Sequence, residues 1–232
     1  MKLSFGEIPD KKNAHVYGLL GVLVGKIETG SHPLKIGISG YIGKTTLAKN
    51  FSAFFGAENC IVIETDDYMR PRAYRRLRGL TGATPEGIDL DKAKRNLSDL
   101  LEGKTIRKPV YDHSTGKVLP DVEVAPRRII IVAGNSPYYP ELGVVYDIGY
   151  FIQVPEESKK WAAGKRAGRS AGERGYDEAA ARIWEEKVLE DYYRFVAPHA
   201  AKADLVYEIS KSRKLRLMRK SPRVEQLLNS RK

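Results

Sequence analysis

The sequence predicts an α/β protein whose sheet is mainly parallel. Short apolar runs of the kind that form buried strands recur along the chain, with stretches of helical periodicity between them. The strand-like runs cover residues 34–38, 60–63, 128–134, 147–154 and 204–209, and the clearest helical stretches cover 89–102 and 177–197. The run 128–134 is apolar almost throughout, as buried strands of parallel sheets are.

The stretch from Leu34 to Asn50 gives the strongest functional signal. Its apolar strand turns through Gly40-Tyr41-Ile42-Gly43 and enters a helix at Lys44-Thr45-Thr46. A strand, a glycine turn and a helix start together present backbone N–H groups and the positive helix end to an anion. The lysine can then reach nucleotide phosphates, and the first threonine can bind magnesium. The sequence therefore predicts a phosphate-binding loop, the alternative being an ordinary glycine turn with an incidental Lys-Thr pair.

This loop is shorter than usual. The motif G-x-x-x-x-G-K-[ST] requires a glycine five residues before Gly43, where Ile38 stands. The nearest earlier glycine of the turn is Gly40, so the loop is about two residues shorter than the motif. We expect it to wrap the phosphates less fully.

Composition limits the class of protein and its partners. The chain has 232 residues, 42% of them hydrophobic, which suits one α/β domain with a sizeable core. A net charge of +11 favours phosphorylated or polyanionic partners. No apolar run reaches the roughly 18–20 residues of a membrane span, the first residues lack a signal-peptide pattern, and the single cysteine, Cys60, fits a reducing compartment. We therefore expect a cytoplasmic protein without membrane contact.

Acidic residues follow the second strand. Glu64, Asp66 and Asp67 come directly after the run 60–63, at the sheet edge where parallel α/β proteins bind ligands. A carboxylate there can accept the proton of an attacking hydroxyl or hold magnesium. The alternative is that one of the two aspartates caps a helix.

Basic residues gather in two segments. Guanidinium groups bind phosphate in a bidentate manner, and a basic segment made flexible by glycines can close over a nucleotide. The alternative for both segments is a solvated basic helix face. The first segment contains Arg70, Arg72, Arg75, Arg76 and Arg78, and the second, from Glu156 to Arg182, contains Lys159, Lys160, Lys165, Arg166, Arg169, Arg174 and Arg182.

Several motifs in order resemble the phosphoribulokinase and uridine kinase family of P-loop small-molecule kinases. After the phosphate loop, Thr65-Asp66-Asp67-Tyr68 looks like the acidic motif of the family. The segment KPVYDHSTG, from Lys108 to Gly116, is similar to the P-x-Y-[ND]-H-x-T-G segment and is closest to that of phosphoribulokinases. Trp161 followed by Arg166-x-x-Arg169-x-x-x-x-Arg174-Gly175 resembles the lid, and Ala203-Asp204-Leu205-Val206 resembles a late strand.

The resemblance implies a three-layer P-loop NTPase fold with a basic helical lid. It also implies ATP-dependent transfer of the γ-phosphate, with Mg²⁺, to a hydroxyl of a small sugar-containing acceptor. We therefore expect an N-terminal helical extension (residues 1–33, with a helix over 13–29), a kinase domain (34–210) and a basic C-terminal tail (211–232). The tail is expected to contact a partner subunit or a nucleic acid, or to be a solvated end.

The resemblance also implies roles for individual residues. Asp66 would be the catalytic base, with Lys44 and Arg169 as further catalytic residues. The nucleotide would contact Gly40, Tyr41, Ile42, Gly43, Lys44, Thr45, Thr46, Arg166, Arg169 and Arg174. The acceptor would contact Asp67, Tyr68, Arg70, Arg72, Tyr111 and His113, and magnesium would be held by Thr45 and Asp66.

One departure from the family concerns the metal. Family members usually end the strand over 128–134 with Glu-Gly, the glutamate lying near the magnesium, whereas this chain has Ala133-Gly134. Three interpretations follow from this. Either Glu64 or Asp67 compensates, or magnesium is held by Thr45, Asp66 and phosphate alone, or the protein has little kinase activity.

Two rival functions come from other classes. A nucleotide-binding sensor or binding module with little or no transfer activity would explain the short loop and Ala133. A nucleic-acid-binding protein would use the net charge and the basic tail, but it leaves Asp66, Tyr111 and His113 without a role, so we do not expect nucleic acid as a partner. The acceptor, the choice of ATP over GTP and the formation of a homodimer are left open.

Overall fold

A six-stranded sheet forms the centre of the computed structural model, which describes residues 5–27, 32–174 and 177–230. The strand order is β2-β5-β1-β6-β7-β8; the first five strands are parallel to their neighbours, and β8 pairs antiparallel with β7. The strands are β1 (Leu34–Gly40), β2 (Cys60–Glu64), β5 (Ile129–Ala133), β6 (Ile148–Gln153), β7 (Leu205–Ile209) and β8 (Leu215–Lys220). The predicted α/β class with a mainly parallel sheet is therefore confirmed.

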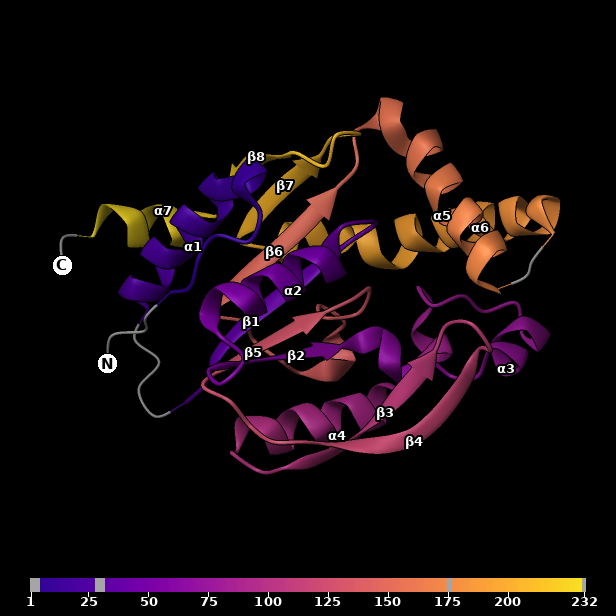
Figure 1. The fold of residues 1–232 in the computed structure, drawn as a ribbon, viewed down its shortest axis with the longest axis horizontal. Helices are drawn as coiled ribbons and strands as arrows, with labels where there is room; N and C mark the ends of the chain where they lie inside the picture. Colours follow the sequence, from indigo (N-terminus) through magenta and orange to yellow (C-terminus); the bar gives the residue numbers. More distant parts are fainter. Residues whose placement is uncertain (1–4, 28–31, 175–176, 231–232) are drawn as a thin grey trace.

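Helix α2 packs on strands β1, β2 and β5 of the central sheet, whereas α4 packs against the strand Ile106–Asp112 and the 3-10 turn Pro140–Leu142 (Figure 1). The helices are α1 (Ala14–Lys26), α2 (Lys44–Phe55), α3 (Arg72–Leu77), α4 (Leu90–Leu101), α5 (Lys159–Arg174), α6 (Glu178–Asp191) and α7 (Pro222–Asn229). Within the described residues, no helix has both the length and the apolar character that a membrane crossing requires.

Burial of aromatic side chains holds α2 against the sheet and against α1. Phe51 of α2 meets the ring of Tyr150 on β6 edge-on, with centroids 5.1 Å apart. Tyr17 of α1 meets Phe51 in the same manner at 5.7 Å. All three side chains are fully buried, and large aromatic side chains contribute strongly to core stability. These contacts fix the helix whose first turn follows the predicted phosphate loop.

Two segments refine the expected secondary structure. The loose alternation over 118–124 is typical of an edge hairpin; this run forms β4 (Lys117–Val124), which pairs antiparallel with β3 (Ile106–Asp112) in a separate two-stranded sheet. The predicted helix over 177–197 is shorter: α6 ends at Asp191 and continues as a π-helical turn, Tyr192–Val196, and a 3-10 turn, Ala197–Lys202.

The two ends of the chain pack onto the same core. The helix expected over 13–29 is α1, with Thr29 outside the described residues. At the other end, β8 completes the sheet and α7 packs against α1. The C-terminal segment therefore contains a strand of the central sheet and a packed helix, and is not the solvated end that we considered for residues 211–232. The division of the chain into an N-terminal extension, a kinase domain and a tail stays a prediction.

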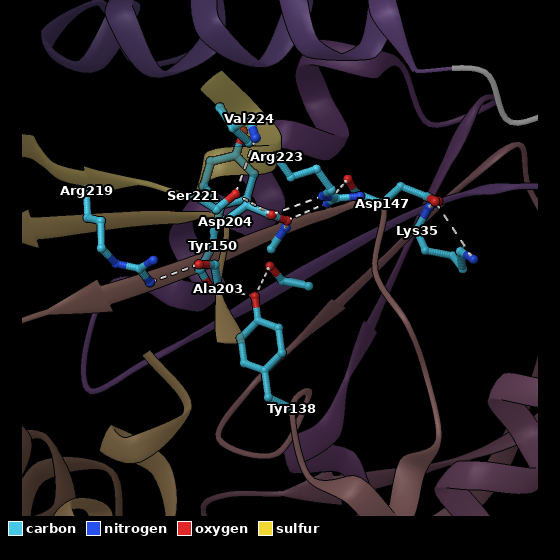
Figure 2. A network of polar contacts seen from close by, with 12 residues as sticks. Lys35, Tyr138, Asp147, Tyr150, Ala203, Asp204, Arg219, Ser221, Arg223 and Val224 are labelled. Carbon is cyan, nitrogen blue, oxygen red and sulfur yellow. Dashed lines mark hydrogen bonds and ion pairs between the residues drawn. The ribbon is translucent and has the colours of Figure 1, made fainter. Parts of the chain in front are cut away.

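A buried aspartate joins β7 to the C-terminal helix (Figure 2). Asp204 accepts hydrogen bonds from the backbone N–H of Gly149 at 2.8 Å and from the Ser221 hydroxyl at 2.8 Å. Its carboxylate also pairs with the Arg223 guanidinium at 2.6 Å, and the same Arg223 nitrogen donates to the backbone oxygen of Asp147 at 2.6 Å. One carboxylate thus ties β6, β7 and the start of α7 together.

Replacing Asp204→Ala should lower the free energy of unfolding by about 2–3 kcal/mol, because it leaves the buried Gly149 N–H and other donors without their acceptor. Chemical denaturation measures this change. Arg216→Ala is the control, since it removes an ion pair with Glu208 whose arginine is mostly exposed, and it should cost below about 1 kcal/mol. Equal losses in the two variants would contradict the role given to Asp204.

Candidate active site

A cleft of about 560 Å³ lies beyond the carboxyl ends of β1 and β2. Its wall is built from the turn between β1 and α2, the end of β2, α3, the β3–β4 hairpin and the helices α5 and α6. Figure 1 shows α5 and α6 projecting past the sheet at this end, with α3 and the hairpin across from them. The predicted lid and the predicted acceptor segment therefore line the same cleft.

The phosphate loop is a tight turn held against β6. Only residues 41–43 separate β1 from α2. Gly40 and Gly43 have φ values of 144° and 88°, and a Cβ on Gly40 would lie 2.2 Å from the backbone oxygen of Ile152, so a side chain is excluded there. The Tyr41 N–H donates to that oxygen at 3.3 Å. The short loop thus directs one amide toward β6 and away from an anion.

The first turn of α2 supplies the positive end of the cleft. Lys44, Thr45 and Thr46 line the cleft together with the loop residues Tyr41, Ile42 and Gly43. Lys44 is buried, and its charge adds to that of the helix N-terminus. The structure brings these predicted nucleotide contacts together, apart from Gly40, which forms the turn behind them.

The two adjacent aspartates point to different surroundings. Asp66 lines the cleft. Asp67 forms an ion pair with Lys108 and accepts a hydrogen bond from the Tyr111 N–H at 3.2 Å, which anchors it to β3. Tyr68 is buried, and its hydroxyl accepts a hydrogen bond from Asn96 at 3.1 Å. Asp67 and Tyr68, both expected to contact the acceptor, are therefore outside the cleft wall.

The acceptor side of the cleft contains one of the two expected arginines, Arg72, together with Arg75, which was not predicted as an acceptor contact. Arg75 is buried and lines the cleft; its guanidinium donates to the Tyr111 hydroxyl at 2.7 Å and to the backbone oxygen of Arg70 at 2.9 Å. Arg72 lines it too and donates to the backbone oxygens of His113 and Ser114. Arg70 does not reach the wall, whereas Tyr111 and His113 do. The i, i+3 spacing of Arg72 and Arg75 on a helix was the available signal.

One lid arginine is held between the phosphate loop and α6. Arg166 forms an ion pair with Glu185 at 2.9 Å and donates to the backbone oxygen of Tyr41 at 3.2 Å. Its guanidinium also lies 4.9 Å from the centre of the Tyr41 ring. The side chains of Arg169 and Arg174, on α5, lie outside the described residues. Nothing in the sequence singled out Glu185, which lines the cleft from α6.

Charge in the cleft is unevenly distributed. Burial raises the pKa of Glu64, and the negative charge of Asp66 adds to this rise, partly offset by Lys49. Burial also raises the pKa of Tyr41 to about 12, which keeps this phenol neutral at physiological pH. The cleft therefore has a carboxylate pair at the end of β2, facing the basic start of α2.

The oxygen donors at this edge fit magnesium. Thr45, Asp66 and Glu64 all line the cleft, and hydroxyl and carboxylate oxygens are ligands that Mg²⁺ prefers. In the part of the chain that the structure describes, no group of three or more His, Cys, Asp or Glu residues is arranged to hold a metal. A site with one or two carboxylates is what Mg²⁺ uses when nucleotide phosphates complete its shell.

Comparison with curated proteins and solved structures agrees with this geometry. The chain is 30% identical over 185 residues to phosphoribulokinase of Synechocystis sp., covering 77% of this chain and 54% of the relative. It is 33% identical over 109 residues to uridine kinase of Brevibacillus brevis, covering 44% of this chain and 51% of the relative. It thus spans about half the length of these relatives. D-glycerate 3-kinase from Cryptococcus neoformans shares the fold, with a TM-score of 0.62 at 14% identity, covering 87% of this chain and 96% of that one.

A family model gives the assignment. The model of the phosphoribulokinase / uridine kinase family matches residues 36–216, which is most of the chain. This range contains the phosphate loop, the acidic strand end, the hairpin and the lid. The chain therefore belongs to the phosphoribulokinase / uridine kinase family.

Proposed function

We propose that this cleft transfers the γ-phosphate of ATP to a hydroxyl of a small, anionic, sugar-containing acceptor. The observation that carries the proposal is the meeting of three elements in one cleft: the phosphate loop, Asp66, and the pair Arg72 and Arg75. Within the described residues, no hydrogen bond or ion pair to the Asp66 side chain occurs, unlike that of Asp67. Asp66 is thus available to a substrate hydroxyl.

The transfer requires positioning and neutralisation of charge more than covalent chemistry. The loop and Lys44 would hold the β- and γ-phosphates. Asp66 would accept the proton of the acceptor hydroxyl as its oxygen bonds to the γ-phosphorus, while the bond from that phosphorus to the bridging oxygen breaks and ADP leaves. Bound Mg²⁺, held through Thr45 and Asp66, would neutralise phosphate charge.

Charge supports an anionic acceptor. The hydrogen bonds of Arg75 within the described residues end on neutral oxygens, those of Tyr111 and of the Arg70 backbone. A buried guanidinium whose partners are neutral is costly unless an anion binds it. Phosphate and carboxylate match its planar fork. The related kinases are named for ribulose, uridine and glycerate substrates, and the arginine pair favours an acceptor that bears a phosphate or a carboxylate.

Nucleotide binding without transfer is the second candidate. The short loop favours it, because the Tyr41 N–H donates to Ile152 and is directed away from the cleft. The two candidates differ in whether ATP is consumed when an acceptor is present, so the variants below are compared by acceptor-dependent ADP release and by nucleotide affinity.

Lys44→Ala should reduce acceptor-dependent ADP release on the order of a hundredfold, about 3 kcal/mol, because the ammonium group stabilises charge in the transition state. Initial rates with Mg²⁺ and ATP measure this loss. Lys104→Ala is the matched control, since this lysine is exposed on the surface and pairs only with Asp99 and Glu102 among the described residues. A wild-type rate in Lys44→Ala would exclude the phosphate role of this residue.

Asp66→Asn should lower kcat by roughly 10²–10⁴-fold, the typical contribution of a general base, while the affinity for metal-free ATP stays close to that of the wild type. Rapid-quench assays give the rate, and calorimetry gives the affinity. A kcat unchanged from the wild type would show that another group accepts the proton.

Arg75→Ala should raise the KM of an anionic acceptor about 10–100-fold, since a hydrogen bond to a charged group is worth about 1.5–3 kcal/mol. The KM for ATP should stay unchanged. Arg76→Ala, on the exposed side of the same helix, is the control and should leave both constants alone. Equal acceptor KM values in Arg75→Ala and the wild type would remove the basis for an anionic acceptor.

A further inference from the structure

We propose that Glu64 supplies the second carboxylate of the magnesium site, acting from β2 at the place where β5 offers only Ala133. This inference rests on the proposed kinase function and deepens it. It assigns the metal ligand that the sequence left open between Glu64, Asp67 and phosphate alone.

The register of the sheet places Glu64 beside Ala133. β2 and β5 are neighbouring parallel strands, and Glu64 pairs with Ala133 at their carboxyl ends. Paired residues of parallel strands direct their side chains to the same face, and neighbouring strands lie about 4.8 Å apart. The Glu64 side chain therefore starts on the strand next to Ala133, one strand spacing away from the position that a longer side chain at residue 133 would occupy.

The face in question is the one that α2 covers. Alternate residues of β2 share a face, which groups Cys60 and Val62 with Glu64. Ser52 of α2 lies beside the Cys60 thiol, and Lys49 of α2 interacts electrostatically with Glu64. The same helix begins with the phosphate-loop lysine and Thr45. Glu64 therefore extends toward the helix whose first turn lines the phosphate end of the cleft.

The other acidic candidates are committed to protein partners. Asp67 pairs with Lys108, and Glu185, which lines the cleft from α6, pairs with Arg166. Of the described acidic residues in the cleft wall, Glu64 and Asp66 form no ion pair within 4 Å. Of the described acidic residues in the cleft wall, these two carboxylates therefore remain for a divalent cation, and the Thr45 hydroxyl lines the same cleft.

The two carboxylates also favour a cation between them by their charge. Glu64 and Asp66 are two residues apart in the chain and line the same cleft, so their negative charges repel each other. A divalent cation placed between two carboxylates removes this repulsion. Mg²⁺ bound by one or two carboxylates and completed by nucleotide phosphates has this arrangement.

The test measures how much Mg²⁺ strengthens ADP binding, with no acceptor and no turnover. Titration calorimetry gives the Kd for ADP with Mg²⁺ and with chelator, and the ratio of the two reports the metal. In Glu64→Gln, which keeps the size of the side chain, this ratio should fall at least about tenfold, the lower limit for losing even a supporting group of a metal site. The Kd without metal should stay unchanged.

Two further variants sharpen the result. Glu58→Ala removes an exposed carboxylate just before the opposite end of β2 and should keep the wild-type ratio. Glu64→Ala combined with Ala133→Glu should recover most of the metal effect that Glu64→Ala loses, because the carboxylate returns on the neighbouring strand. If Glu64→Gln keeps the wild-type ratio of the two Kd values, the assignment of Glu64 as a metal ligand is overturned. If the double variant does not recover the metal effect, the inference that a carboxylate on residue 64 or on residue 133 can serve the same metal site is overturned.

The outcome also separates this inference from the proposed function. A wild-type protein that binds no ADP under either condition would overturn the kinase proposal together with this inference. Magnesium-dependent ADP binding that is insensitive to Glu64 would overturn the inference alone.

Discussion

The contact between the β1–α2 turn and β6 sets the geometry on which the cleft depends. Gly40 lies so close to the backbone oxygen of Ile152 that no side chain fits, and the following N–H donates to the same oxygen. α2 starts three residues later, so the position of Lys44 follows directly from this contact. Arg166 of α5 then binds the backbone oxygen of Tyr41, which places the lid against the same turn.

Neighbouring residues divide structural and chemical roles at the other wall. Asp67 fixes the hairpin through Lys108 and the Tyr111 N–H, while Asp66 lines the cleft. Arg75 in turn contacts the hydroxyl of Tyr111. The acceptor wall is thus held by side chains that were expected to bind substrate themselves. Of the two consecutive aspartates, one therefore holds the wall in place, and the other lines the cleft.

The sequence predicts those features that local patterns encode. Apolar runs located the parallel strands, and the glycine turn before Lys44 located the phosphate loop, because both depend on neighbours in the chain. Arg75 was passed over in favour of Arg70, since the choice depends on which face of the short α3 packs against Tyr111. Glu185 was missed because its partner Arg166 lies on another helix. The proximity of Glu64 and Ala133 requires β2 to pair with β5, which no local pattern shows.

The central claim is that one cleft joins nucleotide phosphates to an acceptor hydroxyl. Phosphorus NMR of the wild-type protein with ATP, Mg²⁺ and pools of sugar phosphates, sugar acids and nucleosides tests it most directly. The account predicts a new phosphate-ester resonance, formed in equal amount with ADP, in a pool that contains phosphate- or carboxylate-bearing acceptors. ATP that binds but gives neither ester nor ADP with any pool would contradict the account and favour a nucleotide-binding protein without transfer.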